Sequence, residues 1–270
     1  MTVCIGAICS DGGKPDSSVV VAADRMVTMG HMVEFEHEVP KLKKITDKIV
    51  TMSAGDALVG SKLARAIDSE FPNVAPSVHA VAEASSKIYV RLRDEKVETD
   101  IFRPRGITRQ QFYEKGCALP QQAAFAIDQE VMRVNLGVEV IIAGVDDAGG
   151  HLYYVGNPGG TAHELGQVGF HAIGSGGIHA LQSLIGSAHC GSHSVADTIF
   201  AVYSAKRRAE AAPGVGKDTD VAIIGPHGYR QLSTKDMSIL SELYAEFSRP
   251  IIADMKDKLA KLSVLDGKDK

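Results

Sequence analysis

Long apolar runs are missing from this chain of 270 residues. A helix needs about 20 consecutive apolar residues to span a bilayer, and no stretch of the sequence approaches that length. The first residues also lack the basic segment and apolar core of a secretory signal. An excess of positive charge is missing too, because the formal net charge is -4. We therefore expect neither a membrane nor a nucleic acid as a partner.

Cysteine is sparse, and the four cysteines present show no CxxC spacing. In a chain of this length they are typical of reduced thiols in a cytoplasmic protein. The segment His189-Cys190-Gly191-Ser192-His193 has a metal-like spacing but no fourth ligand nearby. Since a structural zinc site needs four ligands, we expect a turn with capping groups there, and we predict no metal and no other cofactor.

Strand-like and helical segments come in groups along the chain. The strands predicted in the first half, from β-branched and apolar residues, lie at 2–9, 18–23, 33–37, 41–46 and 49–54, with 33–37 and 41–46 expected to pair. Apolar residues at helical spacing then predict helices at 57–71 and 77–96. The second half repeats the order, with strands at 138–145, 151–155 and 170–173, helices at 178–188 and 194–212, and a closing hairpin at 220–232.

Grouped rather than alternating elements indicate an α+β fold and argue against a doubly wound sheet. Two antiparallel sheets stacked face to face, with helix pairs outside, suit this order. Residues 2–233 are expected to form one domain, followed by a C-terminal helical extension, 234–270, that ends in a disordered tail.

Residues 98–120 are broken by glycine and proline, and they are locally basic through Arg103, Arg105 and Arg109. We interpret them as a loop or an insertion, with a short helix around 108–114. The arginines are expected to form a solvated or subunit-facing surface rather than a nucleic-acid site.

Thr2 directly follows the initiator methionine. Methionine aminopeptidase generally removes methionine before a small residue, so Thr2 is expected to become N-terminal. One residue would then carry a hydroxyl nucleophile and a free α-amine, and the amine can accept the proton of the hydroxyl. Many proteins begin Met-Thr, so this motif needs support from the rest of the chain.

Several segments, in this order and spacing, resemble a proteasome β-type subunit of the N-terminal nucleophile hydrolase superfamily, which includes the bacterial HslV peptidase. They are Thr2–Gly6 (TVCIG), Val20–Arg25 (VVAADR), Pro40–Ile45 (PKLKKI), Thr51–Asp56 (TMSAGD) and Ile173–Gly176 (IGSG). The resemblance covers about residues 2–97 and 137–233. It implies a four-layer α-β-β-α sandwich and hydrolysis of peptide bonds through an acyl-enzyme ester on Thr2.

The resemblance also implies roles for five residues. Thr2 matches the nucleophile, Asp24 the acidic position and Lys41 the lysine. Gly55 matches the glycine whose backbone N–H forms the oxyanion hole, and Ser175 matches the serine beside the N-terminal amine. A lysine cation next to the hydroxyl favours the alkoxide, and a backbone donor can stabilise the tetrahedral oxyanion. Asp24 as a simple strand end and Ser175 as an ordinary turn serine are the competing interpretations.

Five further residues align with positions that hold the substrate backbone or line its side-chain pocket. They are Val27, Thr28, Val39, Ser53 and Ala57. These residues would make a modest, uncharged pocket, from which no cleavage preference follows.

The sequence departs from the family pattern in two places near this site. Met26 stands where the family often has an arginine. The family loop that supports the α-amine should fall near 209–217, where the sequence is AEAAPGVGK. Glu210 or Asp218 could replace the family aspartate there, or neither could.

The resemblance implies a homo-oligomeric ring, stacked in pairs, that acts on unfolded polypeptide or peptide and has an ATP-dependent unfoldase as a possible partner. Two other interpretations stay open. The altered loop at 209–217 would suit a non-catalytic ring or scaffold protein, and the same superfamily includes amidases that act on small-molecule amides.

Overall fold

The computed structural model describes residues 2–10, 17–29, 33–36, 40–71, 75–115 and 119–247. The chain divides into two compact units, Met1–Leu232 and Ser233–Lys270. The second unit contains helix α7 (Thr234–Phe247), and the predicted disordered tail lies outside the described residues. Across the described ranges, no helix is both long and apolar enough to cross a membrane.

The first sheet has the strand order β10-β1-β2-β11-β12, and all neighbours are antiparallel. Its strands are β1 (Cys4–Ser10), β2 (Ser17–Asp24), β10 (Phe170–Ile173), β11 (Thr219–Gly225) and β12 (Gly228–Gln231). Nearly every residue of β1 and β2 is buried. A strand covered on both faces needs apolar residues on both faces, which explains the continuous apolar runs in these segments.

The second sheet has the strand order β5-β6-β7-β8-β9 and is also antiparallel. Its strands are β5 (Leu42–Thr46), β6 (Ile49–Gly55), β7 (Val138–Asp146), β8 (Gly149–Val155) and β9 (Ala162–Glu164). The segments from the two halves of the sequence thus meet in one sheet, with β6 beside β7.

The main core lies between the two sheets and contains residues from both, such as Val21 and Ala222 from the first and Ile141 and Leu152 from the second. The sheets approach closely at Gly6, where an added Cβ would lie 2.6 Å from Leu152 Cδ1. Only glycine fits there without displacing a core side chain.

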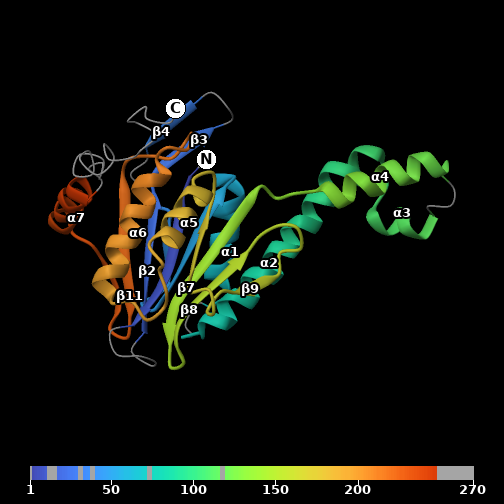
Figure 1. Cartoon of the computed structure of the whole chain (residues 1–270). Coiled ribbons are helices and arrows are strands. Elements are labelled where there is room, and N and C mark those ends of the chain that lie inside the picture. The colour runs from blue at the N-terminus through green and yellow to red at the C-terminus, as the bar shows by residue number, and fades with distance from the viewer. Residues whose placement is uncertain are drawn as a thin grey trace, which may run out of the picture. The chain divides into compact units, whose positions relative to one another are not determined.

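Helices cover the outer face of each sheet (Figure 1). Helices α1 (Ala57–Glu70) and α2 (Val78–Val97) pack on the second sheet through a separate apolar cluster that includes Leu63, Ile67 and Val140. Helices α5 (Gly177–Gly186) and α6 (Val195–Ala209) pack on the first sheet. The predicted four-layer α-β-β-α sandwich is therefore confirmed.

The predicted pairing of 33–37 with 41–46 is wrong. Strand β4 (Val33–Glu36) pairs instead with β3 (Met26–Met29), and β5 pairs with β6. Only Arg25 separates β2 from β3. Arg25 N donates to Asp218 O (3.3 Å), which continues the pairing of β2 with β11 by one residue, and Met26 N donates to the side chain of Asp24 (3.1 Å). A new strand starts at Met26, where the sequence showed only the end of the previous one.

Residues 98–105 form helical turns rather than a loop, and the short helix predicted around 108–114 is confirmed. Helix α2 continues into a π-helical turn, η1 (Glu98–Phe102), and a 3-10 turn, η2 (Arg103–Arg105), and then come α3 (Arg109–Lys115) and α4 (Gln121–Arg133). This helical arm has its own small apolar core, which includes Phe102, Phe112 and Val131. Figure 1 shows the arm extending beyond the sheets. Two of its arginines form ion pairs, Arg105 with Glu130 and Arg109 with Asp94, both at 2.7 Å.

The stacking of the sheets predicts a strong dependence of stability on Ile141, which is fully buried between them. Ile141→Ala is expected to lower the free energy of unfolding by about 2–5 kcal/mol, because it removes buried methyl groups and leaves a cavity. Chemical denaturation at a fixed protein concentration measures this.

The matched control is Ile178→Ala on α5, where the side chain is 63 % exposed. Its effect should stay below about 0.5 kcal/mol. Equal losses in the two variants would contradict the described core.

Candidate active site

Thr2 lies beside two neighbouring strands because of the register of the first sheet. Cys4 pairs with Ala23 of β2 and with Ile173 of β10. Continuing both registers towards the chain start brings Thr2 next to the end of β2 and to the segment after β10. Gly176 N donates to Thr2 O (3.1 Å), and the residue is only 3 % exposed.

Gly174 allows the backbone to pass close to Thr2. It has a φ of 88°, in the region that side-chain-bearing residues rarely adopt. An added Cβ would lie 2.3 Å from Thr2 O. Gly174 N also donates to Glu139 Oε2 (3.1 Å), and this hydrogen bond holds the turn in place.

The Asp24 carboxylate, at the end of β2, is fully buried and accepts hydrogen bonds from five groups. Oδ1 accepts from the Thr2 hydroxyl, from Val3 N (2.9 Å) and from Lys41 Nζ (2.8 Å). Oδ2 accepts from Met26 N (3.1 Å) and from Gly216 N (2.9 Å). A buried charge is tolerated when it is paired and hydrogen-bonded in this way.

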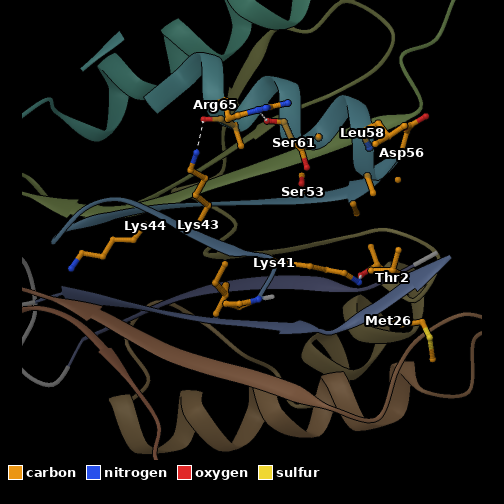
Figure 2. A pocket seen from close by; sticks show the side chains of 18 of the residues that line it. Thr2, Met26, Lys41, Lys43, Lys44, Ser53, Asp56, Leu58, Ser61 and Arg65 are labelled. Atoms are coloured by element: carbon orange, nitrogen blue, oxygen red, sulfur yellow. Dashed lines mark hydrogen bonds between the residues drawn. The ribbon is translucent and has the colours of Figure 1, made fainter. Parts of the chain in front are cut away.

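Lys41 places a cation at the hydroxyl of Thr2. Its Nζ donates to Thr2 Oγ1 as well as to Asp24 Oδ1, and its side chain is largely buried. Figure 2 shows the side chain of Lys41 pointing towards Thr2. A cation at this position stabilises negative charge on the Thr2 oxygen, and the ion pair with Asp24 holds the cation in place.

Ser175 lies at the backbone nitrogen of Thr2. Thr2 N donates to Ser175 Oγ (3.1 Å), and that hydroxyl lies 3.3 Å from Pro213 O, to which it donates. The structure therefore brings Thr2, Asp24, Lys41 and Ser175 together, from four separate parts of the chain.

The two carboxylates proposed to support the Thr2 nitrogen have other partners. Glu210 Oε1 accepts from Lys206 Nζ (2.8 Å). The side chain of Asp218 hydrogen-bonds Glu36, which raises the pKa of Asp218. Within the described residues, neither carboxylate is a hydrogen-bond partner of Thr2 N.

A cleft of about 920 Å³ opens at Thr2 and Lys41 (Figure 2). Gly55 and three of the predicted substrate-binding residues, Val27, Ser53 and Ala57, line it. Of the other two, Thr28 belongs to β3 but its side chain lies outside the described part, and Val39 lies outside the described residues altogether.

Gly55 ends β6 directly before the first turn of α1. Its φ is 110°, and an added Cβ would lie 2.0 Å from Gly137 O. The next residue, Asp56, caps α1 by accepting from Leu58 N (2.9 Å) and Val59 N (3.0 Å). Gly55 thus lies at a strand-to-helix junction on the cleft wall, and its role as an oxyanion donor stays a prediction.

Cys4, two residues beyond Thr2, does not compete as a nucleophile. Burial raises the pKa of its thiol to about 12. The thiolate is the reactive form of cysteine, and it is almost absent at neutral pH with such a pKa.

No metal site accompanies this arrangement in the described part of the chain, which contains no suitable cluster of three or more His, Cys, Asp or Glu residues. In the segment 189–193, His189 Nε2 faces Ile8 O (3.1 Å). Directly after it, Ser194 caps α6 by accepting from Asp197 N (3.1 Å).

Sequence reasoning missed Lys206 and Gly216. Lys206 stands in the basic run Lys206-Arg207-Arg208, which is typical of an exposed helix end. Its spacing could have revealed it, because it follows the buried residues Thr198 and Val202 at intervals of four. Gly216 offered no such signal, since its contact with Asp24 depends on the path of a loop.

Two stacked antiparallel sheets between helix pairs, with a threonine at the head of the first strand, define the N-terminal nucleophile hydrolase fold. Residues 4–92 match the family model described as Proteasome subunit, about a third of the chain. In this stretch the chain is thus similar to a proteasome subunit, and the fold agrees with that similarity. No protein with a curated description matches the chain significantly.

Proteasome subunits assemble into oligomeric rings, and the family includes threonine peptidases as well as non-catalytic subunits. The similarity therefore leaves the catalytic status of Thr2 to be argued from its surroundings.

The five donors at Asp24 predict a structural cost for Asp24→Asn. Either orientation of the amide turns an NH2 group towards N–H donors and leaves Lys41 without its carboxylate. The free energy of unfolding is expected to fall by at least about 2 kcal/mol, as measured by chemical denaturation.

Asp100→Asn is the control, because Asp100 forms an exposed ion pair with Lys96. Exposed pairs contribute little to stability, so this variant should unfold like the unmodified protein. An Asp24→Asn variant as stable as the control would contradict the hydrogen-bond pattern at Asp24.

Proposed function

We propose that the protein is an N-terminal-threonine endopeptidase subunit of a proteasome-like particle. The observation that carries the proposal is the convergence of Lys41 and Asp24 on the hydroxyl of the buried Thr2, at the edge of a large cleft. A threonine that served only to start a strand would not need a buried ion pair at its hydroxyl.

Catalysis begins after removal of Met1, because until then the nitrogen of Thr2 is an amide and cannot act as a base. The free amine accepts the proton of the Thr2 hydroxyl, and the oxygen attacks the carbonyl carbon of the substrate peptide bond. Lys41 stabilises the charge that develops on the attacking oxygen. Ser175, which accepts from the Thr2 nitrogen, fixes the direction of the base.

The tetrahedral intermediate carries an oxyanion, which accepts a hydrogen bond from the N–H of Gly55 in this mechanism. A donor at that position contributes about 2.7–4 kcal/mol to the transition state. The protonated amine then gives its proton to the leaving amine, and the acyl group stays on Thr2 as an ester. Water, activated by the same amine, hydrolyses the ester and restores Thr2.

The substrate in this proposal is an unfolded polypeptide or a peptide. The cleft, at about 920 Å³, is near the upper end of the range for small-molecule pockets, and several of the predicted substrate-binding residues line it. Homo-oligomeric, stacked rings would enclose the site, and an ATP-dependent unfoldase could deliver substrate to it.

A non-catalytic ring subunit is the second candidate. The observation in its favour is that Glu210, at the position of the loop that supports the amine, pairs with Lys206 instead. The protein would then keep the fold without turnover. An amidase for a small substrate is distinguished from a peptidase by comparing fluorogenic peptides with small amides.

Replacing Thr2 tests the proposal. Thr2→Ala keeps the amine but loses the nucleophile, so peptide hydrolysis should fall to background in a particle of unchanged size. Thr2→Ser keeps both groups and should retain measurable hydrolysis. The assay uses fluorogenic peptides and protein whose intact mass shows that Met1 is absent.

Hydrolysis by Thr2→Ala at the rate of the unmodified protein would contradict the proposal. Absence of hydrolysis from an assembled, unmodified protein that lacks Met1 would favour the non-catalytic subunit.

A further inference from the structure

Lys206 is an unusual residue for the interior of a protein. It lies near the end of α6, on the helix face that also buries Thr198 and Val202, and it is 0 % exposed. Lysine is almost never fully buried unless it is paired. Burial lowers the pKa of Lys206, while the nearby carboxylates of Glu210 and Asp24 oppose this shift.

The ammonium group of Lys206 has two identified partners. Nζ donates to Glu210 Oε1, one helical turn further on, and to the backbone carbonyl of Lys217, both at 2.8 Å. The first bond closes a local ion pair. The second reaches the loop between α6 and β11, so Lys206 ties that loop to the helix.

The loop that Lys206 holds, residues 213–218, touches two members of the candidate active site. Gly216 N donates to Asp24 Oδ2 (2.9 Å), and Pro213 O accepts from Ser175 Oγ (3.3 Å). Gly216 stands next to Lys217 in the chain. A shift of the Lys217 carbonyl would therefore move the donor that orients Asp24.

Glu36 holds the same loop from its other side. Its Oε1 accepts from Lys217 N and from Asp218 N (3.0 Å). The backbone around Lys217 is thus held from two sides. Lys206 donates to its carbonyl, and Glu36 accepts from the N–H groups of Lys217 and Asp218.

From this arrangement we infer that Lys206 is a positioning residue, which holds the loop 213–218 so that Gly216 orients Asp24 and Pro213 orients Ser175. This inference rests on the proposed function, since orientation of Asp24 and Ser175 matters for a nucleophile at Thr2. Lys206 does not touch the reacting atoms and acts through the loop.

Stability alone does not explain the buried pair. Apolar residues of similar volume often replace a buried ion pair without loss of stability, or with a gain. An apolar side chain cannot, however, donate to the Lys217 carbonyl. Replacing both Lys206 and Glu210 therefore separates a role in stability from a role in holding the loop. The fold should survive, while the loop loses its hydrogen bond to residue 206.

The test uses the double variant Lys206→Met/Glu210→Leu in the full chain. We expect an assembled particle with a melting temperature near that of the unmodified protein. Small misplacements of catalytic groups can cost up to about 100-fold in rate, so kcat for a fluorogenic peptide should fall by roughly 10-fold to 100-fold. KM should change little, since the substrate cleft does not include Lys206.

Two controls accompany it. Lys96→Met/Asp100→Leu removes an exposed lysine–carboxylate pair with the same spacing of four residues and should leave kcat unchanged. Glu210→Gln keeps Lys206 and its bond to Lys217, so its kcat should stay close to that of the unmodified protein.

Amide hydrogen exchange gives a readout that does not depend on turnover. In the double variant, the peptide that covers 213–218 should exchange faster than in the unmodified protein. The exposed-pair control should leave that exchange unchanged.

The inference is overturned by a folded double variant with unchanged kcat, or with unchanged exchange at 213–218. A double variant that fails to fold overturns it as well, because the pair would then be a requirement of folding. If the unmodified protein, lacking Met1, hydrolyses no peptide, the proposed function fails, and the exchange measurement still decides whether Lys206 holds the loop.

Discussion

The buried carboxylate of Asp24 is the interaction on which the site depends. Its two oxygens receive donors from the start of β1, from Lys41 before β5, from the start of β3 and from the loop before β11. A buried carboxylate is costly unless its hydrogen bonds are complete. Each of these segments therefore has to be in place before Asp24 is satisfied, which couples the geometry at Thr2 to the folding of the whole sandwich.

The sandwich supplies the rigidity that this coupling needs. The register between β1 and β2 sets the distance from Thr2 to Asp24, and the register between β1 and β10 sets its distance to Ser175. A shift of one residue in either pairing would turn the side chains to the opposite face of the sheet. Close approach of the two sheets opposes such a shift, because a side chain at the position of Gly6 would displace Leu152 in the core.

Lys41 and Lys206 both lie near Asp24, but they have different partners and different roles. Lys41 lines the cleft and donates to the Thr2 hydroxyl, whereas Lys206 lies on α6 and donates to the carbonyl of Lys217. Glu210, which could have supported the Thr2 nitrogen, instead neutralises Lys206. In the loop at 209–217, whose sequence departs from the family pattern, the carboxylate of Glu210 therefore balances the charge of the buried Lys206.

Much of the fold could be predicted from the sequence, because grouped strands and helices suit few architectures. The strands β1, β2 and β6 and the helices α1 and α2 were visible as apolar runs and helical spacing. Strand β3 was not, because only Arg25 separates it from β2 and no glycine or proline marks the boundary in the sequence. Residues 98–105 were misjudged, because Pro104 and Gly106 suggested a loop where the chain forms tight helical turns.

The candidate site was predictable only where resemblance fixed the positions, as for Thr2, Asp24, Lys41 and Ser175. Residues that act through backbone atoms, such as Gly216 and Pro213, leave no side-chain signal in a sequence. Lys206 was concealed for a different reason: a basic residue near a helix end is usually solvated, and only its tertiary surroundings reveal that it is buried.

The most direct measurement is the reaction of a peptide epoxyketone with the protein, followed by mass spectrometry of its N-terminal peptide. Such a reagent can bond both to the hydroxyl and to the α-amine of one residue. If Thr2 is a nucleophile with its own amine as base, the adduct forms on a peptide that begins at Thr2, and Thr2→Ala abolishes it. An assembled protein that begins at Thr2 and forms no adduct would contradict the account.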